Sequence, residues 1–431
     1  MEISLNCPRC GEEVVVDLEK AHKIKKCPHC GQPWRGSRAA DGGISASGGE
    51  KPSGTGKVSK AIKTIKTKNV LTAIVVSALV LLLGALVLFN LPWQIGWIFL
   101  FGYGVLFLAA EIVYWAIFGK KNVYKRFFIE ENDAGDGIRI AGYIGLFTAT
   151  VPQTIGGCVV NEIGANAFWK HKALRRITLP DSVNTIGYGA FFHCVNLKSI
   201  RIPASVTKIG DAAFVSCNKL TEAALPEGLT VIEQRTFLYC RKLKSVTIPD
   251  SVTKIGDYAF EGCDQLEFNK IYGSSLKYLG NENNPYMVCM GASYSGINSC
   301  RIHERSKIIY SEAFANQDKL QSVTIPKSII FIGSWAFYKC SRLTGVEIPD
   351  SVTAIGKEAF YRCASLKKIV IPRSVVSMES RVFFECGSRF NKLMIYCEAE
   401  NQPSGWHKYW TEAESSLSSC SVVWGYKGEE S

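Results

Sequence analysis

Four cysteines near the start of the chain have the spacing of a metal site. Cys7 and Cys10 form one C-x2-C pair, Cys27 and Cys30 form a second, and a glycine follows each pair. Two such pairs can supply four thiolates in a tetrahedron, the geometry of structural Zn²⁺ sites. Because four thiolates leave no coordination position for water, we expect a structural zinc ion, held by a zinc ribbon over residues 1–36. The alternative, two redox-active C-x-x-C pairs, lacks the βαβ context of such motifs.

A larger set of cysteines recurs at a fixed interval along the chain. Each lies three residues after a periodic phenylalanine, at Cys194, Cys217, Cys240, Cys263, Cys340, Cys363 and Cys386. Metal ligation, disulfide formation, redox sensing and simple burial as small apolar side chains are the alternatives. One thiol per repeat forms a row, whereas a zinc ion needs four thiolates that converge on it. We therefore expect these cysteines to be buried structural residues.

The remaining polar residues show no catalytic arrangement. No Ser/His pair shares a location, no carboxylate dyad stands out, and His171 and His303 are isolated. We therefore expect a protein that is not an enzyme.

The elements that position these cysteines come from a repeat of 23 residues. Its anchors are Phe168, Phe191, Phe214, Phe237 and Phe260, and then Phe314, Phe337, Phe360 and Phe383. Leucine follows six residues after most of these anchors, and an alternating apolar pair follows the leucine, giving L-x-x-I-x-I. A fixed period in this range with this core is typical of a leucine-rich-repeat solenoid. We predict an α/β fold, with a parallel β-sheet on the concave face and a short helical turn at each A-F-x-x-C segment on the opposite face.

Residues beside the inward apolar positions of the predicted strands should point outward. They are Arg176, Thr178, Ser199, Arg201, Glu222, Ser245, Thr247, Phe268, Lys270, Ser322, Thr324, Glu347 and Lys368. Together they should line the concave face, the usual recognition surface of solenoids. Hydroxyls and charges of both signs on such a face favour binding of an unidentified protein or other ligand; an unliganded, solvated sheet is the alternative.

The consensus I-P-x-S-V-T-x-I-G-x-x-A-F-x-x-C-x-x-L-x-x-I-x-I resembles the BspA-like leucine-rich-repeat family of bacterial proteins. The repeat domain is expected at 138–431, with an insert near 279–298 and a C-terminal cap at 391–426. The resemblance implies ligand recognition, often of proteins at a cell surface. A cell-surface adhesin-like protein is therefore an alternative function.

An apolar region between the ribbon and the repeats predicts a membrane anchor. A flexible, basic linker is expected at 37–69, two transmembrane helices at 70–90 and 95–118, and a juxtamembrane segment at 119–137. Lysines precede the first helix and follow the second, and the connecting turn has none, so both termini are expected in the cytoplasm. Glu111, the one charge within the second helix, is expected to be neutral or at a helix interface.

The net charge of +12 is concentrated near the N-terminus. Residues 1–69 hold 13 Lys and Arg against 7 Asp and Glu, and no cleavable signal peptide is expected there. This excess suits lipid headgroups, and nucleic-acid binding by the ribbon and the linker is a further alternative. We favour the bilayer, because lysines beside an apolar segment are typical membrane-proximal anchors.

Overall fold

A computed structural model describes residues 2–6, 13–17, 58, 62, 122–124, 126–387, 392–411 and 420–428. The chain divides into two units, Met1–Ser53 and Gly54–Ser431. In the first unit, β1 (Glu2–Asn6) pairs antiparallel with β2 (Glu13–Asp17). The four cysteines of the expected zinc ribbon and both expected membrane helices lie outside the described residues. Within the described ranges, no helix is long and apolar enough to span a membrane.

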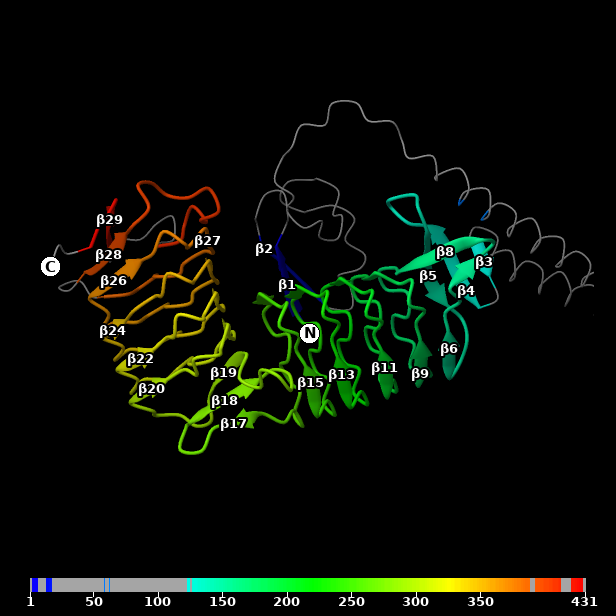
Figure 1. Cartoon of the computed structure of the whole chain (residues 1–431), viewed down its shortest axis with the longest axis horizontal. Helices are drawn as coiled ribbons and strands as arrows, with labels where there is room; N and C mark the ends of the chain where they lie inside the picture. The colour runs from blue at the N-terminus through cyan, green and yellow to red at the C-terminus, as the bar shows by residue number, and fades with distance from the viewer. Residues whose placement is uncertain are drawn as a thin grey trace, which may run out of the picture. The chain divides into compact units, whose positions relative to one another are not determined.

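Each repeat contributes a short strand to a column of parallel strands, here called the strand column (Figure 1). Its members are β6 (Thr148–Thr150), β9 (Arg176–Thr178), β11 (Ser199–Arg201), β13 (Glu222–Ala224), β15 (Ser245–Thr247), β20 (Ser299–Arg301), β22 (Ser322–Thr324), β24 (Gly345–Val346) and β26 (Lys368–Ile371). Residues 23 apart are in register, as where Arg176 pairs with Ser199 in β9 and β11. The prediction of a parallel-strand leucine-rich-repeat solenoid is confirmed.

A second column of parallel strands, not predicted from the sequence, includes the Ile-Gly motif of most repeats. It contains β8 (Cys158–Ile163), β10 (Thr185–Ile186), β12 (Lys208–Ile209), β14 (Val231–Ile232), β16 (Lys254–Ile255), β21 (Ile308–Ile309), β23 (Phe331–Ile332), β25 (Ala354–Ile355) and β27 (Ser377–Met378). The glycine permits close approach of neighbouring repeats: a Cβ on Gly256 would lie 2.5 Å from the backbone nitrogen of Gln234. In the repeats that carry it, a glycine usually read as a turn signal therefore permits close packing against the preceding repeat.

The A-F-x-x-C segments form a third column, here called the turn column, and the expectation of helical turns there is wrong. No helix occurs in these segments where the structure describes them, and residues such as His193 and Ser216 have φ of 57°. Left-handed residues break a right-handed helix. Their backbone groups instead bond between repeats: the Phe191 N–H donates to the Ala213 carbonyl at 2.8 Å, and the Phe214 N–H to the Thr236 carbonyl at 2.9 Å. The described repeats are thus a β-solenoid of strands and turns, and not an α/β structure.

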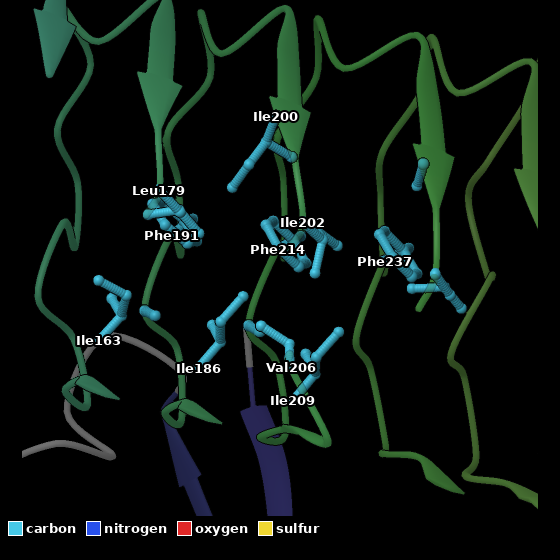
Figure 2. Close-up of a cluster of buried hydrophobic side chains, with 14 of the residues drawn as sticks. Ile163, Leu179, Ile186, Phe191, Ile200, Ile202, Val206, Ile209, Phe214 and Phe237 are labelled. Carbon is cyan, nitrogen blue, oxygen red and sulfur yellow. The ribbon is translucent and has the colours of Figure 1, made fainter. Parts of the chain in front are cut away.

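The core consists of identical side chains stacked from repeat to repeat. Phe191, Phe214 and Phe237 are fully buried, and their rings lie 5.3 Å apart with interplanar angles of 4–6°. Figure 2 shows these rings beside a row of isoleucines from the second column. Because each side chain is covered by its counterparts, a single repeat has no closed core and depends on its neighbours.

Antiparallel strands lie at the start of the stack and at its interruption. At the start, β3 (Asn122–Tyr124), β4 (Phe127–Glu131) and β5 (Ile138–Tyr143) pair in sequence, and β5 joins β8. The expected juxtamembrane segment therefore contributes strands to the first sheet. Between β16 and β21, an insert contains β17 (Asn269–Lys270), β18 (Leu276–Leu279) and β19 (Val288–Ala292), of which β19 returns to parallel pairing with β21.

The C-terminal end of the stack has a separate cover. Strands β28 (Leu393–Cys397) and β29 (Cys420–Trp424) extend the strand column beyond β26. The buried Trp410 ring lies 6.0 Å from Phe383, the last phenylalanine of the stack, in an edge-to-face arrangement. This aromatic contact shields the final repeat from solvent.

Candidate functional site

The outward side chains of the strand column form a continuous exposed surface, here called the strand face. Eleven of the thirteen residues expected to line it are exposed, while Ser199 and Phe268 are partly buried. The residues between them, such as Ile177 and Val323, are buried. This alternation follows from the period of two in a strand, and it confines the core to one side and solvent contact to the other.

Phe268 and Lys270 do not lie in the parallel column, contrary to expectation. Lys270 lies in β17, which pairs antiparallel with β18 and places Lys270 opposite Lys277, and Phe268 directly precedes this strand. Asn269 aligns in sequence with the inward apolar residues of the other repeats, such as Val246 and Val323, but it is exposed, and its Nδ2 donates to the Pro285 carbonyl at 2.9 Å. An amide at this position cannot be buried in the apolar stack without a hydrogen-bond partner. The antiparallel pair of β17 and β18 therefore takes the place of one strand of the strand column.

The predicted set omits Thr148 and Thr150 of β6 and two residues of a degenerate repeat, all of which are exposed on the strand face. Ser299 and Arg301 in β20 are exposed and stand in register with Ser322 and Thr324. The alternation of Cys300 and Ile302 around Arg301 was the available signal, but the periodic phenylalanine is absent from that repeat.

The insert also exposes an aromatic side chain. Tyr272 lies in the turn between β17 and β18 and is fully exposed, at 105% of its reference area. Nearby, the Lys277 Nζ lies 4.9 Å from the centre of the Phe268 ring. A tyrosine offers a large, rigid contact area at a small entropic cost, and such residues are enriched at binding hot spots.

At the C-terminal edge of the strand face, Lys368 contacts the last strands. Its Nζ lies 5.1 Å from the centre of the Tyr396 ring and 5.7 Å from that of Tyr426. Cation–π contacts of this kind hold the ammonium group against the aromatic faces. Lys368 thus links the strand face to the terminal strands as well as lining it.

The periodic cysteines are hydrogen-bond donors between repeats. The Cys194 Sγ donates to the Phe168 carbonyl at 3.1 Å, and Cys217 and Cys240 make the same bond to Phe191 and Phe214. Burial raises the pKa of Cys194 to about 12. These thiols are therefore protonated at neutral pH, and each satisfies a carbonyl of the turn column.

Alkaline pH should destabilise the stack through these thiols. The ordinary thiol pKa of 9.0 applies in the unfolded chain, whereas Cys194 ionises near 12 when folded, so its contribution is present in full below pH 9 and is lost as pH rises toward 12. We expect the free energy of unfolding, measured by denaturant titration, to fall over this range. In Cys194→Ala the fall should be shallower by about 1.4 kcal/mol per pH unit. An identical slope in the variant would show that this thiol does not titrate as proposed.

A pair of acidic residues comes together beside the second column, which the sequence analysis did not foresee. Burial raises the pKa of Asp211 and of Glu233, and their carboxyl groups share a hydrogen bond. The charges of Lys208 and Lys254 favour the ionised form of Glu233 and oppose this rise. Across the described residues, no group of three or more His, Cys, Asp or Glu side chains could hold a metal ion. The carboxyl pair has the character of a structural contact between repeats.

Comparisons with known proteins match the repeat region. A family model described as "BspA type Leucine rich repeat region (6 copies)" matches residues 157–282 and 292–401, more than half of the chain. A solved leucine-rich-repeat protein of T. pallidum is 29% identical, with a TM-score of 0.37, covering 52% of this chain and 91% of that one. A leucine-rich cell surface protein from Faecalibacterium prausnitzii A2-165 is 25% identical, with a TM-score of 0.31, covering 64% and 88%. The pneumococcal vaccine antigen PcpA is 17% identical, with a TM-score of 0.31, covering 65% and 94%. No curated protein matches the chain.

Proposed function

The chain belongs to the BspA-type leucine-rich-repeat family, and from this premise we propose that it is a membrane-anchored, non-enzymatic protein that binds another protein through its strand face. The observation that carries this proposal is the exposed, in-register set of polar side chains on an apolar scaffold. In a solenoid the core positions are constrained by stacking, whereas the outward positions are free to match a ligand. A constant core with variable outward residues suits the recognition of a protein partner.

The part of the strand face from β20 to β26, together with the insert turn, is the favoured contact region for the protein partner. It combines hydroxyls at Ser322 and Thr324 with charges of both signs at Arg301 and Glu347. Protein interfaces are enriched in tyrosine and arginine and depleted in lysine. Tyr272 and Arg301 are therefore the residues proposed to contribute most to affinity.

The anchor and the ribbon are proposed from the sequence. The uncharged run from 70 to 89 has the length of a membrane-spanning helix, and the lysines on its N-terminal side favour a cytoplasmic placement of the repeats. Strands β1 and β2 bracket Cys7 and Cys10, with Asn6 opposite Glu13. An antiparallel pair whose strands flank a C-x2-C sequence supports the proposed zinc ribbon, in which Zn²⁺ would be structural.

An affinity capture experiment with matched variants tests the binding face. The full chain, solubilised in detergent, is used to capture proteins from its own cells, and the captured proteins are compared with those retained by a Tyr272→Ala, Arg301→Glu variant. We expect at least one protein whose recovery falls by about tenfold or more, since a hot-spot residue contributes about 2 kcal/mol or more.

The control for this experiment is Lys327→Glu, which changes an exposed charge beyond the end of β22. Its recovery of the same protein should equal that of the unaltered chain. If every captured protein is retained equally by the face variant, the proposed contact region is wrong. Conversion of a small molecule by the purified chain would contradict the non-enzymatic assignment.

A further inference from the structure

Four successive strands of the strand column, β9, β11, β13 and β15, lie in a strongly basic part of the strand face. A strip made of residues 172–178, 195–201, 218–224 and 241–247 carries nine cationic side chains and one acidic one, Glu222. The cations are Lys172, Arg175, Arg176, Lys198, Arg201, Lys219, Arg241, Lys242 and Lys244, and all are exposed. The later part of the strand face, in contrast, mixes both signs.

None of these nine cations forms an ion pair within the described part of the chain. Parallel strands lie about 4.8 Å apart, so the charges of successive strands are close neighbours. Like charges on neighbouring strands repel one another, and an anionic ligand relieves this repulsion. The basic strip therefore fits a surface or polymer with many negative charges.

An exposed apolar loop borders the strip. Its presence favours a ligand that has apolar groups as well as negative charges. The loop joins β5 to β6 and contains Ile144, Leu146 and Phe147, which are 44%, 60% and 51% exposed. The Arg175 guanidinium carbon lies 4.8 Å from the centre of the Phe147 ring, so the loop touches the edge of the basic strip. Adjacent exposed apolar side chains of this size mark an interaction site.

The loop is held in its outward position by hydrogen bonds. The Phe147 carbonyl accepts from the backbone N–H of Arg175 at 2.7 Å, and the Gly145 carbonyl lies 2.7 Å from the His171 Nε2. Because the backbone is fixed at both points, Leu146 and Phe147 cannot fold back onto the core without breaking these bonds. Their exposure is thus a property of the folded loop.

We propose that the basic strip and the loop Ile144–Phe147 dock on an anionic phospholipid bilayer, with the lysines and arginines at the headgroups and Leu146 and Phe147 in the interface. Basic residues beside large apolar ones are the combination that binds peripheral proteins to anionic membranes. A nucleic acid would use the charges but leave the aliphatic side chains without a role. This inference rests on the proposed function in one respect. The proposed membrane anchor would hold the basic strip and the loop Ile144–Phe147 beside a bilayer.

Lysine acylation of the full chain tests the docking directly. The chain is placed in nanodiscs of phosphatidylcholine alone or of phosphatidylcholine with phosphatidylglycerol, and the reactivity of each lysine is read by mass spectrometry. We expect Lys172, Lys219 and Lys242 to react about fivefold more slowly in the anionic discs. About 1 M salt should abolish this difference, since it shortens the Debye length to about 3 Å.

Two kinds of control accompany this experiment: lysines elsewhere in the same chain, and variants of the loop and of the strip. Lys319 and Lys327 are exposed in the later repeats and should react equally in both discs. A Leu146→Ser, Phe147→Ser variant should lose most of the protection, and a Lys198→Glu, Lys244→Glu variant should lose it as well. Both pairs are exposed, so thermal melts should match those of the unaltered chain.

Equal reactivity of the strip lysines in both discs overturns the inference. Protection that requires added RNA and ignores phosphatidylglycerol also overturns it, in favour of nucleic acid. A chain that fails to enter nanodiscs contradicts the proposed anchor, and the docking is then tested by adding phosphatidylglycerol vesicles to the chain. Protection by these vesicles would uphold the inference without the anchor, and its absence would refute it.

Discussion

Replacement of Phe214 by alanine is expected to lower the free energy of unfolding of the repeats by about 3–5 kcal/mol. The Phe214 ring is fully buried and stacks at 5.3 Å on both Phe191 and Phe237. Its removal leaves a cavity that cannot collapse, because the turn column on one side and the two strand columns on the other hold the repeats at fixed spacing. Guanidinium titration followed by circular dichroism measures the change.

The cooperativity of unfolding should change as well in Phe214→Ala. Solenoid stability depends on interfaces between neighbours, so a weak interface separates the repeats on either side into partly independent units. We expect a broader transition or two transitions. Tyr272→Ala, which removes a fully exposed ring, is the control and should change stability by less than about 0.5 kcal/mol. A loss below about 1 kcal/mol in Phe214→Ala would contradict the role of the ring stack.

Removal of zinc is expected to unfold residues 1–36 and leave the repeats intact. Four-thiolate sites contribute about 10–16 kcal/mol of apparent binding free energy, far more than so short a segment could gain from a core. The purified chain should contain one zinc ion, which elemental analysis can count, and Cys7→Ser should contain none. Proteolysis should then cut the N-terminal segment readily.

The matched control is Cys194→Ser, which alters a cysteine of the turn column. This variant should keep its zinc, because the Cys194 Sγ is committed to the Phe168 carbonyl. Zinc that persists in Cys7→Ser, or zinc lost in Cys194→Ser, would show that the metal is held elsewhere. The cysteines of the proposed zinc site belong to the unit Met1–Ser53 and the repeats to the unit Gly54–Ser431, so we expect chelation to leave the melting of the repeats unchanged.

The repeat architecture could be predicted from the sequence because stacking repeats the same contact. A phenylalanine every 23 residues means that Phe191, Phe214 and Phe237 occupy equivalent sites, so the pattern itself predicts the buried ladder. Strand positions followed in the same way from the alternation of apolar and polar residues. For the same reason the outward residues of β9 to β15 were identified before the structure was known.

Departures from the pattern were decided by tertiary contacts. Phe268 and Lys270 match the strand-face positions in sequence, yet Asn269 between them is exposed and hydrogen-bonded to Pro285, and its strand joins an antiparallel hairpin. The A-F-x-x-C pattern marks the turn column but not its conformation, since His193 and Ser216 are ordinary residues that adopt left-handed conformations and bond to the next repeat. Such bonds depend on residues of the next repeat, and the conformational preference of a single residue carries no information about them.

By itself, then, the sequence of this protein determined which residues face the core, because burial follows the period. Only the tertiary structure decided how the outward residues combine. The basic strip draws its charges from four repeats, and it meets the Leu146–Phe147 loop because β6 pairs with β9, as where Thr148 lies opposite Arg176. Surface charge is not constrained by packing, so its grouping appears only when the strands are placed side by side.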